Sequence, residues 1–208
     1  MMLPSSLINK TEWVLVGPMG PEPTETLSQF PIIAIDGGAH HLECPDIWVG
    51  DADSYEKKVS CKHVFRHPPK KDLSDFALAL SLFKVPHHYK LHLWGLLGGR
   101  RDHELFNFGE SSRFLDRHSE SEIIFYGSDG KIHFHFLGAG TWKFSHEGLF
   151  SLGTLKNTLV KLRGNCQFPI PKLLEITPLS SFGLSNVGEG EMTLENQGPV
   201  FLYYPGGK

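Results

Sequence analysis

Acidic side chains stand close together at three places along the chain, each beside residues typical of turns. Asp51 and Asp53 follow an apolar run in the segment GDADS, Asp72 and Asp75 lie in KKDLSD, and Asp102 lies in GGRRDH. Neighbouring carboxylates repel each other unless a cation or water lies between them. Mg²⁺ binds a few carboxylates together with phosphate oxygens and water. If folding gathers the three segments, they would suit a magnesium–polyphosphate centre.

The glycines and arginines before Asp102 add groups that recognise phosphate. Gly98 and Gly99 have no side chain, so their backbone N–H groups could approach a phosphate closely, with the start of a helix behind them. The guanidinium group of Arg100 is a planar donor suited to phosphate oxygens. Each segment alone also fits a plain turn, a helix cap or a glycine loop. Their conjunction is what favours a binding site.

These segments need a scaffold that brings distant loops together, and the first part of the chain predicts one. Ser74 can cap a helix that continues through an apolar stretch towards Pro86, and a second helix is expected over 102–115. Strands alternating with helices predict a mainly parallel sheet, whose carboxyl-end loops gather along one edge. The predicted strands are apolar runs rich in β-branched residues, at 13–17, 31–36, 46–50, 89–95 and 122–127.

The pattern changes near residue 128. The remainder consists of short, partly alternating segments separated by Gly, Asn and Pro, which favours an antiparallel sandwich or barrel. We therefore predict an α/β domain with a mainly parallel sheet over residues 1–128 and an all-β sandwich over 129–208. The second part is small enough that packing against the first, or against a second copy of the chain, would help to stabilise it.

Composition narrows the class of protein. The chain has 208 residues and a formal net charge of −3, so a broad basic surface for nucleic acid is not expected. The first ten residues lack the pattern of a signal peptide, and the apolar stretch at 76–83 is too short to cross a bilayer. No membrane association is therefore expected. The 3 cysteines are scattered, which predicts thiols in a reducing cytoplasm.

Several segments, in order, resemble the thiamin pyrophosphokinase (thiamin diphosphokinase) family. DGGAHHL and PDIWVGDADS are similar to the family's DGGAN and PDxxxGDxDS motifs, although His40 stands where the family usually has Asn. HPPKKDLSDFALAL resembles PxxKDxTDxxxAL with Ser74 in place of Thr, and GGRRDHELFN resembles GGRxDHxxxN. SSFGLSN, at 180–186, is similar to a stretch of the family's C-terminal domain. The resemblance spans about residues 31–190.

The resemblance implies a fold, a reaction and a set of site residues. The family joins an α/β catalytic domain to a β-sandwich and works as a homodimer with thiamin bound between subunits, transferring pyrophosphate from ATP to the hydroxyl of thiamin. It implies catalytic residues Asp51, Asp53, Asp75, Asp102 and Arg100, the four aspartates also holding Mg²⁺. ATP contacts are implied for Lys71, Asp72, Gly98, Gly99, Arg100 and Asn107, and thiamin contacts for Asp36, Ser185, Asn186 and Phe168.

Other interpretations fit parts of the sequence. DADS also fits the metal-binding DxD of a nucleotide-sugar glycosyltransferase, although such an enzyme has no need of KKDLSD and GGRRDH. A thiamin- or nucleotide-binding relative without turnover is a further alternative. Phe168 could equally be a core aromatic residue, and Asp36 could simply end a strand at a turn.

Overall fold

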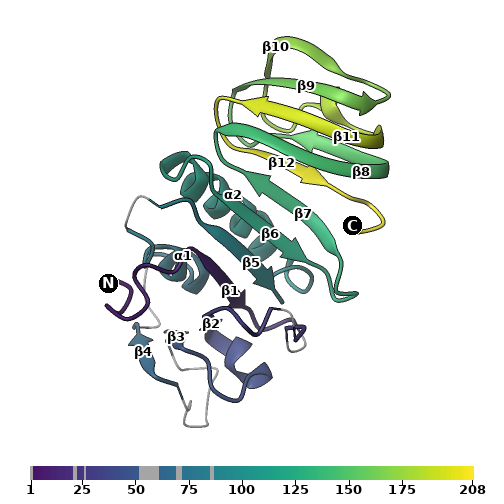
Figure 1. Cartoon of the computed structure of the whole chain (residues 1–208). Helices are drawn as coiled ribbons and strands as arrows, with labels where there is room; N and C mark the ends of the chain where they lie inside the picture. Colours follow the sequence, from purple (N-terminus) through teal and green to yellow (C-terminus); the bar gives the residue numbers. More distant parts are fainter. Residues whose placement is uncertain (1, 21–22, 26, 52–60, 69–71, 85–86) are drawn as a thin grey trace.

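The computed structural model describes residues 2–20, 23–25, 27–51, 61–68, 72–84 and 87–208, and all structural statements below refer to these residues. The described strands form a twelve-stranded mixed sheet with the order β10-β9-β11-β8-β12-β7-β6-β5-β1-β2-β3-β4. Figure 1 shows this sheet running through the whole molecule, with few helices beside it. No helix in the described part of the chain is long and apolar enough to span a membrane.

The first half of the chain supplies the parallel strands of this sheet. Every pairing among them is parallel, and β1 lies between β2 and β5 in the order. Apart from the edge strand β4, these strands are short and largely buried, as expected for strands covered on both faces. The strands are β1 (Glu12–Val16), β2 (Ile32–Ile35), β3 (Ile47–Gly50), β4 (His63–Arg66), β5 (Lys90–Trp94) and β6 (Glu122–Tyr126).

Both α-helices contribute to one hydrophobic core together with these strands. Alternation along β1 directs Trp13 and Leu15 into the core that contains α1 (Asp75–Leu80) and α2 (Arg101–Arg117), and Val14 and Val16 into a smaller cluster. The predicted N-cap is confirmed, because the Ser74 hydroxyl accepts a hydrogen bond of 3.1 Å from the Ala77 N–H. The helix is shorter than predicted and ends at Leu80.

The second half of the chain forms the antiparallel strands. The turn after β6 leads into β7, which pairs with β6 and so continues the same sheet. A second hydrophobic cluster draws on all six of these strands, while Phe136 of β7 still belongs to the first cluster. The predicted boundary at 128/129 and the packed sandwich remain predictions. The elements are β7 (Ile132–Leu137), β8 (Gly140–Gly153), β9 (Thr158–Cys166), β10 (Ile170–Ile176), the short 3₁₀ turn η2 (Ser181–Gly183), β11 (Asn186–Asn196) and β12 (Val200–Tyr203).

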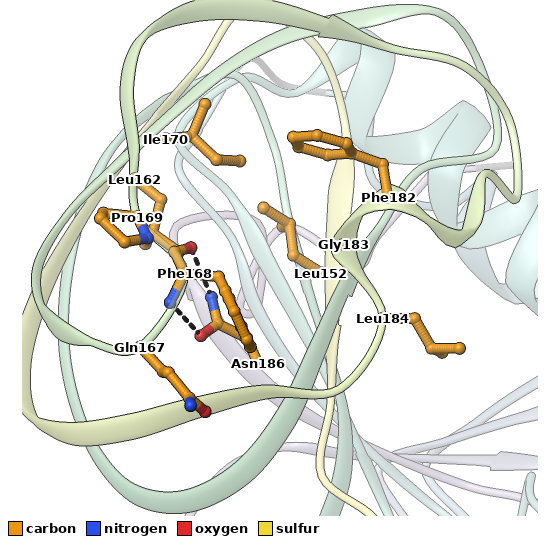
Figure 2. A pocket seen from close by; sticks show the side chains of 10 residues that line it. All are labelled: Leu152, Leu162, Gln167, Phe168, Pro169, Ile170, Phe182, Gly183, Leu184 and Asn186. Atoms are coloured by element: carbon orange, nitrogen blue, oxygen red, sulfur yellow. Dashed lines mark hydrogen bonds between the residues drawn. The ribbon is translucent and has the colours of Figure 1, made fainter.

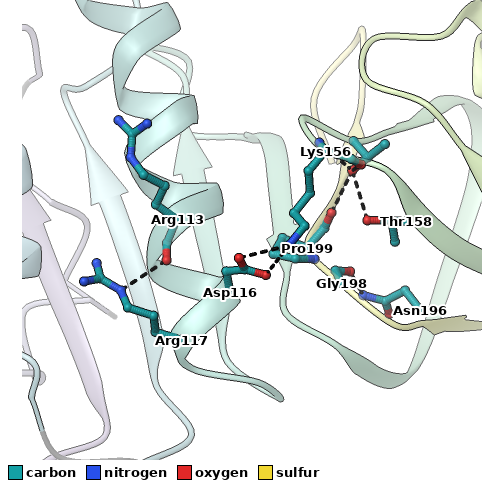
Figure 3. Close-up of polar contacts among 9 residues, drawn as sticks. Arg113, Asp116, Arg117, Lys156, Thr158, Asn196, Gly198 and Pro199 are labelled. Carbon is teal, nitrogen blue, oxygen red and sulfur yellow. Dashed lines mark hydrogen bonds and ion pairs between the residues drawn. The ribbon is translucent and has the colours of Figure 1, made fainter.

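Polar contacts join the end of α2 to the loop between β8 and β9. The Lys156 ammonium group lies 2.8 and 2.9 Å from the two carboxylate oxygens of Asp116, and Figure 3 shows this pair reaching across from the helix. Beneath it the buried hydroxyl of Thr154 lies 2.6 Å from the carbonyl oxygen of Lys156 and 2.9 Å from that of Pro199. The ion pair is half exposed, whereas the hydroxyl is shielded from water.

Burial decides which of these contacts stabilises the fold more. We expect Thr154→Val to lower the free energy of unfolding by about 1–3 kcal/mol, because it leaves buried carbonyl groups without a donor. Lys156→Ala should cost no more than about 1 kcal/mol, since an exposed ion pair gains little over hydration. Chemical denaturation of both variants checks this order. An equal or larger loss for Lys156→Ala would contradict it.

Candidate functional site

The loops that carry the sequence motifs leave the carboxyl ends of neighbouring parallel strands. Asp36 follows β2 and opens the 3₁₀ turn η1 (Asp36–His41), Asp51 follows β3, and the glycine loop follows β5. Hydrogen bonds tie the β1 and β5 ends together, from the Gly17 N–H to the Trp94 carbonyl at 2.7 Å and from the Met19 N–H to the Gly95 carbonyl at 3.0 Å. A ligand at this edge would meet several motifs at once.

Close backbone packing explains the glycines beside two of the predicted aspartates. A Cβ atom on Gly38 would lie 2.0 Å from the Val16 carbonyl oxygen, so η1 can cross the end of β1 only with glycine there. A Cβ atom on Gly50 would lie 3.2 Å from Cα of Asp36, which places the ends of β2 and β3 side by side. Asp36 itself has the left-handed backbone angle φ of 46°. The DGG segment after β2 and the GD segment at the end of β3 therefore pack against each other at the carboxyl edge of the sheet.

The starts of the two α-helices face each other across a small cavity. Asp72 and Ser74, before α1, line this space of about 250 Å³ opposite His103 and Asn107 from the first turns of α2. Asn107 is buried and donates from its side chain to the Leu96 carbonyl oxygen at 3.3 Å, so it holds the loop after β5. Residues 72–74 of the KKDLSD motif and His103 of the GGRRDH motif therefore line the same cavity.

The glycine loop exposes its backbone at this edge. Gly98 and Gly99 have φ values of 84° and 69°, a region that favours glycine, and nothing lies within 4 Å of where a Cβ of Gly98 would stand. Glu104, in the first turn of α2, accepts a hydrogen bond of 3.3 Å from the Gly98 N–H. Sequence reasoning missed Glu104, although an acid in a first helical turn is a common partner for preceding N–H groups.

Arg100 and Asp102 form an ion pair at the start of α2. The guanidinium group lies 2.5 Å from one carboxylate oxygen and donates at 3.1 Å to the other, a two-point contact. Hydrogen bonding from Arg100, with a smaller contribution from its charge, lowers the pKa of Asp102 from 3.8 to about 2. Both side chains are exposed, so this pair is open to a polyphosphate that competes for the arginine.

We expect Arg100→Gln to return the pKa of Asp102 from about 2 towards 3.8. The variant removes the cation that favours the ionised carboxylate. Because the folded-state pKa is the lowered one, the pair's stabilisation is present above about pH 4 and is lost as the pH falls towards 2. Carboxyl-carbon NMR titration measures the shift directly. An unchanged titration in the variant would show that the arginine does not set this pKa.

Three of the four predicted metal ligands, Asp51, Asp75 and Asp102, are among the described residues. Within the described ranges, no three His, Cys, Asp or Glu side chains lie close enough together to hold a metal ion. Asp53 and Lys71 lie outside the described residues. Asp51, Asp75 and Asp102 offer the hard oxygen donors that Mg²⁺ prefers, and this ion needs only one or two protein carboxylates when phosphate oxygens and water complete its shell. The donor set therefore fits magnesium in its chemistry.

A second pocket lies in the antiparallel half and contains two of the residues implied for thiamin. Figure 2 shows Phe168 and Asn186 at its wall, together with Phe182 and Leu184 from the SSFGLSN segment. The cavity measures about 500 Å³ and is largely apolar. Phe168 is 58% exposed, so it is a rim residue and not part of the core. Sequence reasoning identified the SSFGLSN segment but missed Phe182 and Leu184 within it, although apolar residues within a polar turn are a usable signal.

Asn186 fixes the shape of this pocket. Its side-chain oxygen accepts from the N–H groups of Phe168 at 3.0 Å and Val187 at 2.8 Å, and its amide donates to the Phe168 carbonyl at 2.8 Å. Ser185 lies beside the lining, with a φ of 59° and its N–H bonded to the Ser151 hydroxyl at 3.1 Å. Asp36 is not near these residues, because β2 and the β9–β11 region occupy opposite ends of the molecule (Figure 1). Within a single chain, Asp36 is therefore far from the other residues implied for thiamin.

Comparisons with known proteins give a consistent picture. Residues 27–125 match the family model described as thiamin pyrophosphokinase, catalytic domain. No curated protein sequence gives a significant match. The chain is similar in fold to the crystal structure of thiamine pyrophosphokinase from Bacillus subtilis, with a TM-score of 0.70 and 20% identity over 93% of this chain and 97% of that one.

Eukaryotic structures are similar as well. Thiamin pyrophosphokinase from Candida albicans matches with a TM-score of 0.71 and 14% identity over 97% of this chain and 90% of that one. The yeast enzyme matches with a TM-score of 0.64 and 13% identity over 97% of this chain and 89% of that one. These identities are low, so the structures show the shared fold, while the family model matches the sequence that carries the acidic motifs. Residues 27–125 therefore match the catalytic-domain model of the thiamin pyrophosphokinase family, and the chain as a whole is similar in fold to these structures.

Proposed function

We propose that this chain transfers the pyrophosphoryl group of ATP to the hydroxyl of thiamin, giving thiamin diphosphate and AMP. The match of residues 27–125 to the catalytic-domain model of the family carries this proposal. The joined motif segments at the carboxyl edge of the parallel strands support it, because they supply carboxylates, an arginine and bare glycine backbone in one region. We place the protein in the cytoplasm.

We assign each of these residues a separate role in the reaction. The thiamin oxygen bonds to the β-phosphorus of ATP, the bond from that phosphorus to the α–β bridging oxygen breaks, and AMP leaves with that oxygen. Arg100 and the N–H groups of Gly98 and Gly99 would stabilise charge on the phosphates, with Lys71 assisting. One of the carboxylates Asp51, Asp53, Asp75 or Asp102 would accept the hydroxyl proton. Mg²⁺, held by these aspartates, would neutralise phosphate charge when bound.

We further propose that the enzyme is a homodimer whose active site forms between subunits. Within one chain, the pocket of Phe168 and Asn186 lies at the opposite end from the β2 and β3 strand ends that carry Asp36 and Asp51 (Figure 1). A thiamin molecule in that pocket could not present its hydroxyl to the same chain's phosphate edge. A second copy could bring its own edge to the pocket, which would reunite the residues.

Product analysis tests the proposed reaction. The full chain is incubated with ATP, thiamin and Mg²⁺, and the products are separated by chromatography. We expect AMP and thiamin diphosphate in equal amounts, with neither formed when thiamin is omitted or Mg²⁺ is chelated. ADP with thiamin monophosphate would contradict pyrophosphoryl transfer, and thiamin binding without any AMP would indicate a relative without turnover.

A further inference from the structure

Three hydrogen-bonded polar side chains cross the parallel strands on the face away from α1 and α2. Leu91 and Leu93 of β5 belong to the core that contains both helices, so His92 between them points to the other face. His92 is buried, with 4% of its surface exposed. Its Nε2 lies 2.9 Å from a carboxylate oxygen of Glu12 in β1, and its Nδ1 lies 2.9 Å from the hydroxyl of Tyr126 in β6. The phosphate and thiamin motifs include none of these three residues.

The two contacts fix which ring nitrogen carries the hydrogen when His92 is neutral. An ionised carboxylate only accepts, so Nε2 carries the hydrogen and donates it to Glu12. Burial, with smaller contributions from the charges of Glu122 and Glu12, raises the pKa of Tyr126 to about 12. The tyrosine hydroxyl therefore stays protonated and donates to Nδ1. The neutral imidazole satisfies both neighbours at once.

A second proton on His92 breaks one of these two bonds. The imidazolium ion carries a hydrogen on both nitrogens, so Nδ1 can no longer accept from Tyr126. The buried hydroxyl then loses its acceptor, which destabilises the fold. Burial lowers the pKa of His92 from its ordinary value of 6.5. Lys90 lowers this pKa further, whereas Glu12 and Glu122 oppose the shift.

Other charged groups surround the histidine, and all of them are closer to water. The Lys90 ammonium group lies 3.5 Å from a carboxylate oxygen of Glu12 and 3.8 Å from one of Glu122 in β6. Glu122 also lies 2.6 Å from the ring of His135 in β7. The side chains of these four residues are 17–40% exposed, so water can reach them. A charge on the more deeply buried His92 requires movement of its surroundings.

The cover over the His92 ring is the part of its surroundings that can move. The backbone of β5 is paired on both sides here, with Val14 of β1 and Ile124 of β6 opposite the histidine. Phe30 stacks on the imidazole, with ring centroids 5.7 Å apart and planes at 11°. It belongs to a turn at residues 27–30, between β1 and β2. Turns open at a lower free energy than strands inside a sheet, so water would reach the ring by displacing Phe30.

We propose that Glu12, His92 and Tyr126 form a proton-sensitive latch, which holds the turn at residues 27–30 on the sheet while His92 is neutral and releases it when His92 takes up a proton. The folded state disfavours this proton. The latch therefore contributes its full stability above about pH 6.5 and loses it as the pH falls through the lowered pKa of folded His92. This inference does not depend on the proposed reaction.

NMR spectroscopy tests the latch at the residues that form it. The ring carbons of His92 report its protonation. Amide hydrogen exchange of Leu27 and Phe30, corrected for the intrinsic effect of pH, reports the turn. Between about pH 8 and about pH 4 we expect the protection of both amides to fall about tenfold or more, in step with the titration of His92. His92→Gln should abolish this dependence, while His88→Gln, at a histidine whose side chain is 70% exposed, should retain it.

Two conservative variants should move the transition in opposite directions. Tyr126→Phe removes the donor that favours the neutral imidazole, so the pKa of His92 and the midpoint of opening should rise by about 0.5–1 pH unit. Glu12→Gln removes the carboxylate that favours the imidazolium ion, so both should fall by about the same amount. A purely structural role of these side chains would lower stability at every pH and leave the midpoint in place.

Three results would overturn the latch. The first is full protection of Leu27 and Phe30 while His92 becomes protonated, because the turn then does not respond to the charge. The second is a His92 that stays neutral down to about pH 4, and the third is a midpoint that moves in the same direction in Tyr126→Phe and Glu12→Gln. The wild-type titration and these two variants keep the test valid if His92→Gln does not fold.

Discussion

Replacing Asp75 by Asn is expected to lower the rate of AMP formation about 100- to 1,000-fold while leaving the protein folded. The variant removes one charge from the proposed magnesium–phosphate centre, and single electrostatic groups in such centres contribute effects of this size. Asp75 is also the first residue of α1, where a negative charge favours the helix. That contribution is at most about 1 kcal/mol, so the fold should tolerate its loss. Steady-state kinetics and thermal unfolding together measure both effects.

The matched control is Asp116→Asn. Asp116 lies near the opposite end of α2 and pairs with Lys156 at 2.8 Å, away from the motif segments. We expect its AMP formation to stay within about twofold of wild type, since exposed ion pairs contribute little. Asp53→Asn, a change in the same proposed ligand set, should behave like Asp75→Asn. Full activity in both Asp53→Asn and Asp75→Asn would exclude these carboxylates from the centre.

Replacing Asn186 by Ala is expected to raise the KM for thiamin at least about tenfold and to lower the free energy of unfolding by about 2–3 kcal/mol. The change removes the three hydrogen bonds of 2.8–3.0 Å that the buried Asn186 side chain makes to the backbone of Phe168 and Val187. Backbone groups left without partners in a buried site cost about 1–3 kcal/mol each, partly offset where water can reach them. The affinity for ATP should not change, because the pocket lies apart from the glycine loop.

A second variant separates binding from stability at this pocket. Phe168→Leu keeps an apolar side chain at an exposed rim position but removes the aromatic face. A cationic ring such as the thiazolium of thiamin gains about 0.5–2 kcal/mol from such a face, so KM should rise up to about tenfold with unchanged stability. Leu173→Ala, on an equally exposed part of β10, is the control. An unchanged KM for thiamin in both pocket variants would remove thiamin from this cavity.

The strands of the parallel sheet could be predicted from sequence because burial on both faces demands continuous apolar runs. All five predicted runs contain the strands β1, β2, β3, β5 and β6 with small differences at the ends. β4 was missed, since it lies at the edge of the sheet and alternates between half-buried and exposed residues. Only the last two residues of β10 fell in a predicted segment, EITPL, because five consecutive exposed residues at the other edge remove its apolar pattern.

Helix ends and long strands depended on details that the apolar pattern does not contain. α1 ends early because the Ser81 hydroxyl bonds to the Leu78 carbonyl oxygen at 2.7 Å, an alternative to continuing the helix. Conversely, Gly109 does not interrupt α2, because Phe114 and Leu115 anchor the helix in the core. The apolar stretches at 141–144 and 148–153 belong to the single strand β8, in which Gly148 takes a φ of 110°.

The candidate site was predictable in its chemistry and not in its layout. Acidic and glycine-rich loops after parallel strands gather at one edge, so a cavity lined by both residues 72–74 and His103 agrees with the topology. The pocket of Phe168 and Asn186 depends on how β9, β10 and β11 turn, which no local pattern specifies. The separation of Asp36 from that pocket is likewise a property of the whole sheet (Figure 1). This separation is the feature that most favours an active site shared between two chains.

The most direct test of a shared magnesium–polyphosphate centre is a Mn²⁺ titration followed by electron paramagnetic resonance. The full chain is titrated in the presence of an ATP analogue whose α–β bridge is a methylene group, which blocks transfer. If the centre exists, wild type binds Mn²⁺ more tightly than the free analogue does, and Asp53→Asn, Asp75→Asn and Asp102→Asn each weaken that binding while Asp116→Asn does not. Equal Mn²⁺ binding by wild type and all three variants would contradict the account.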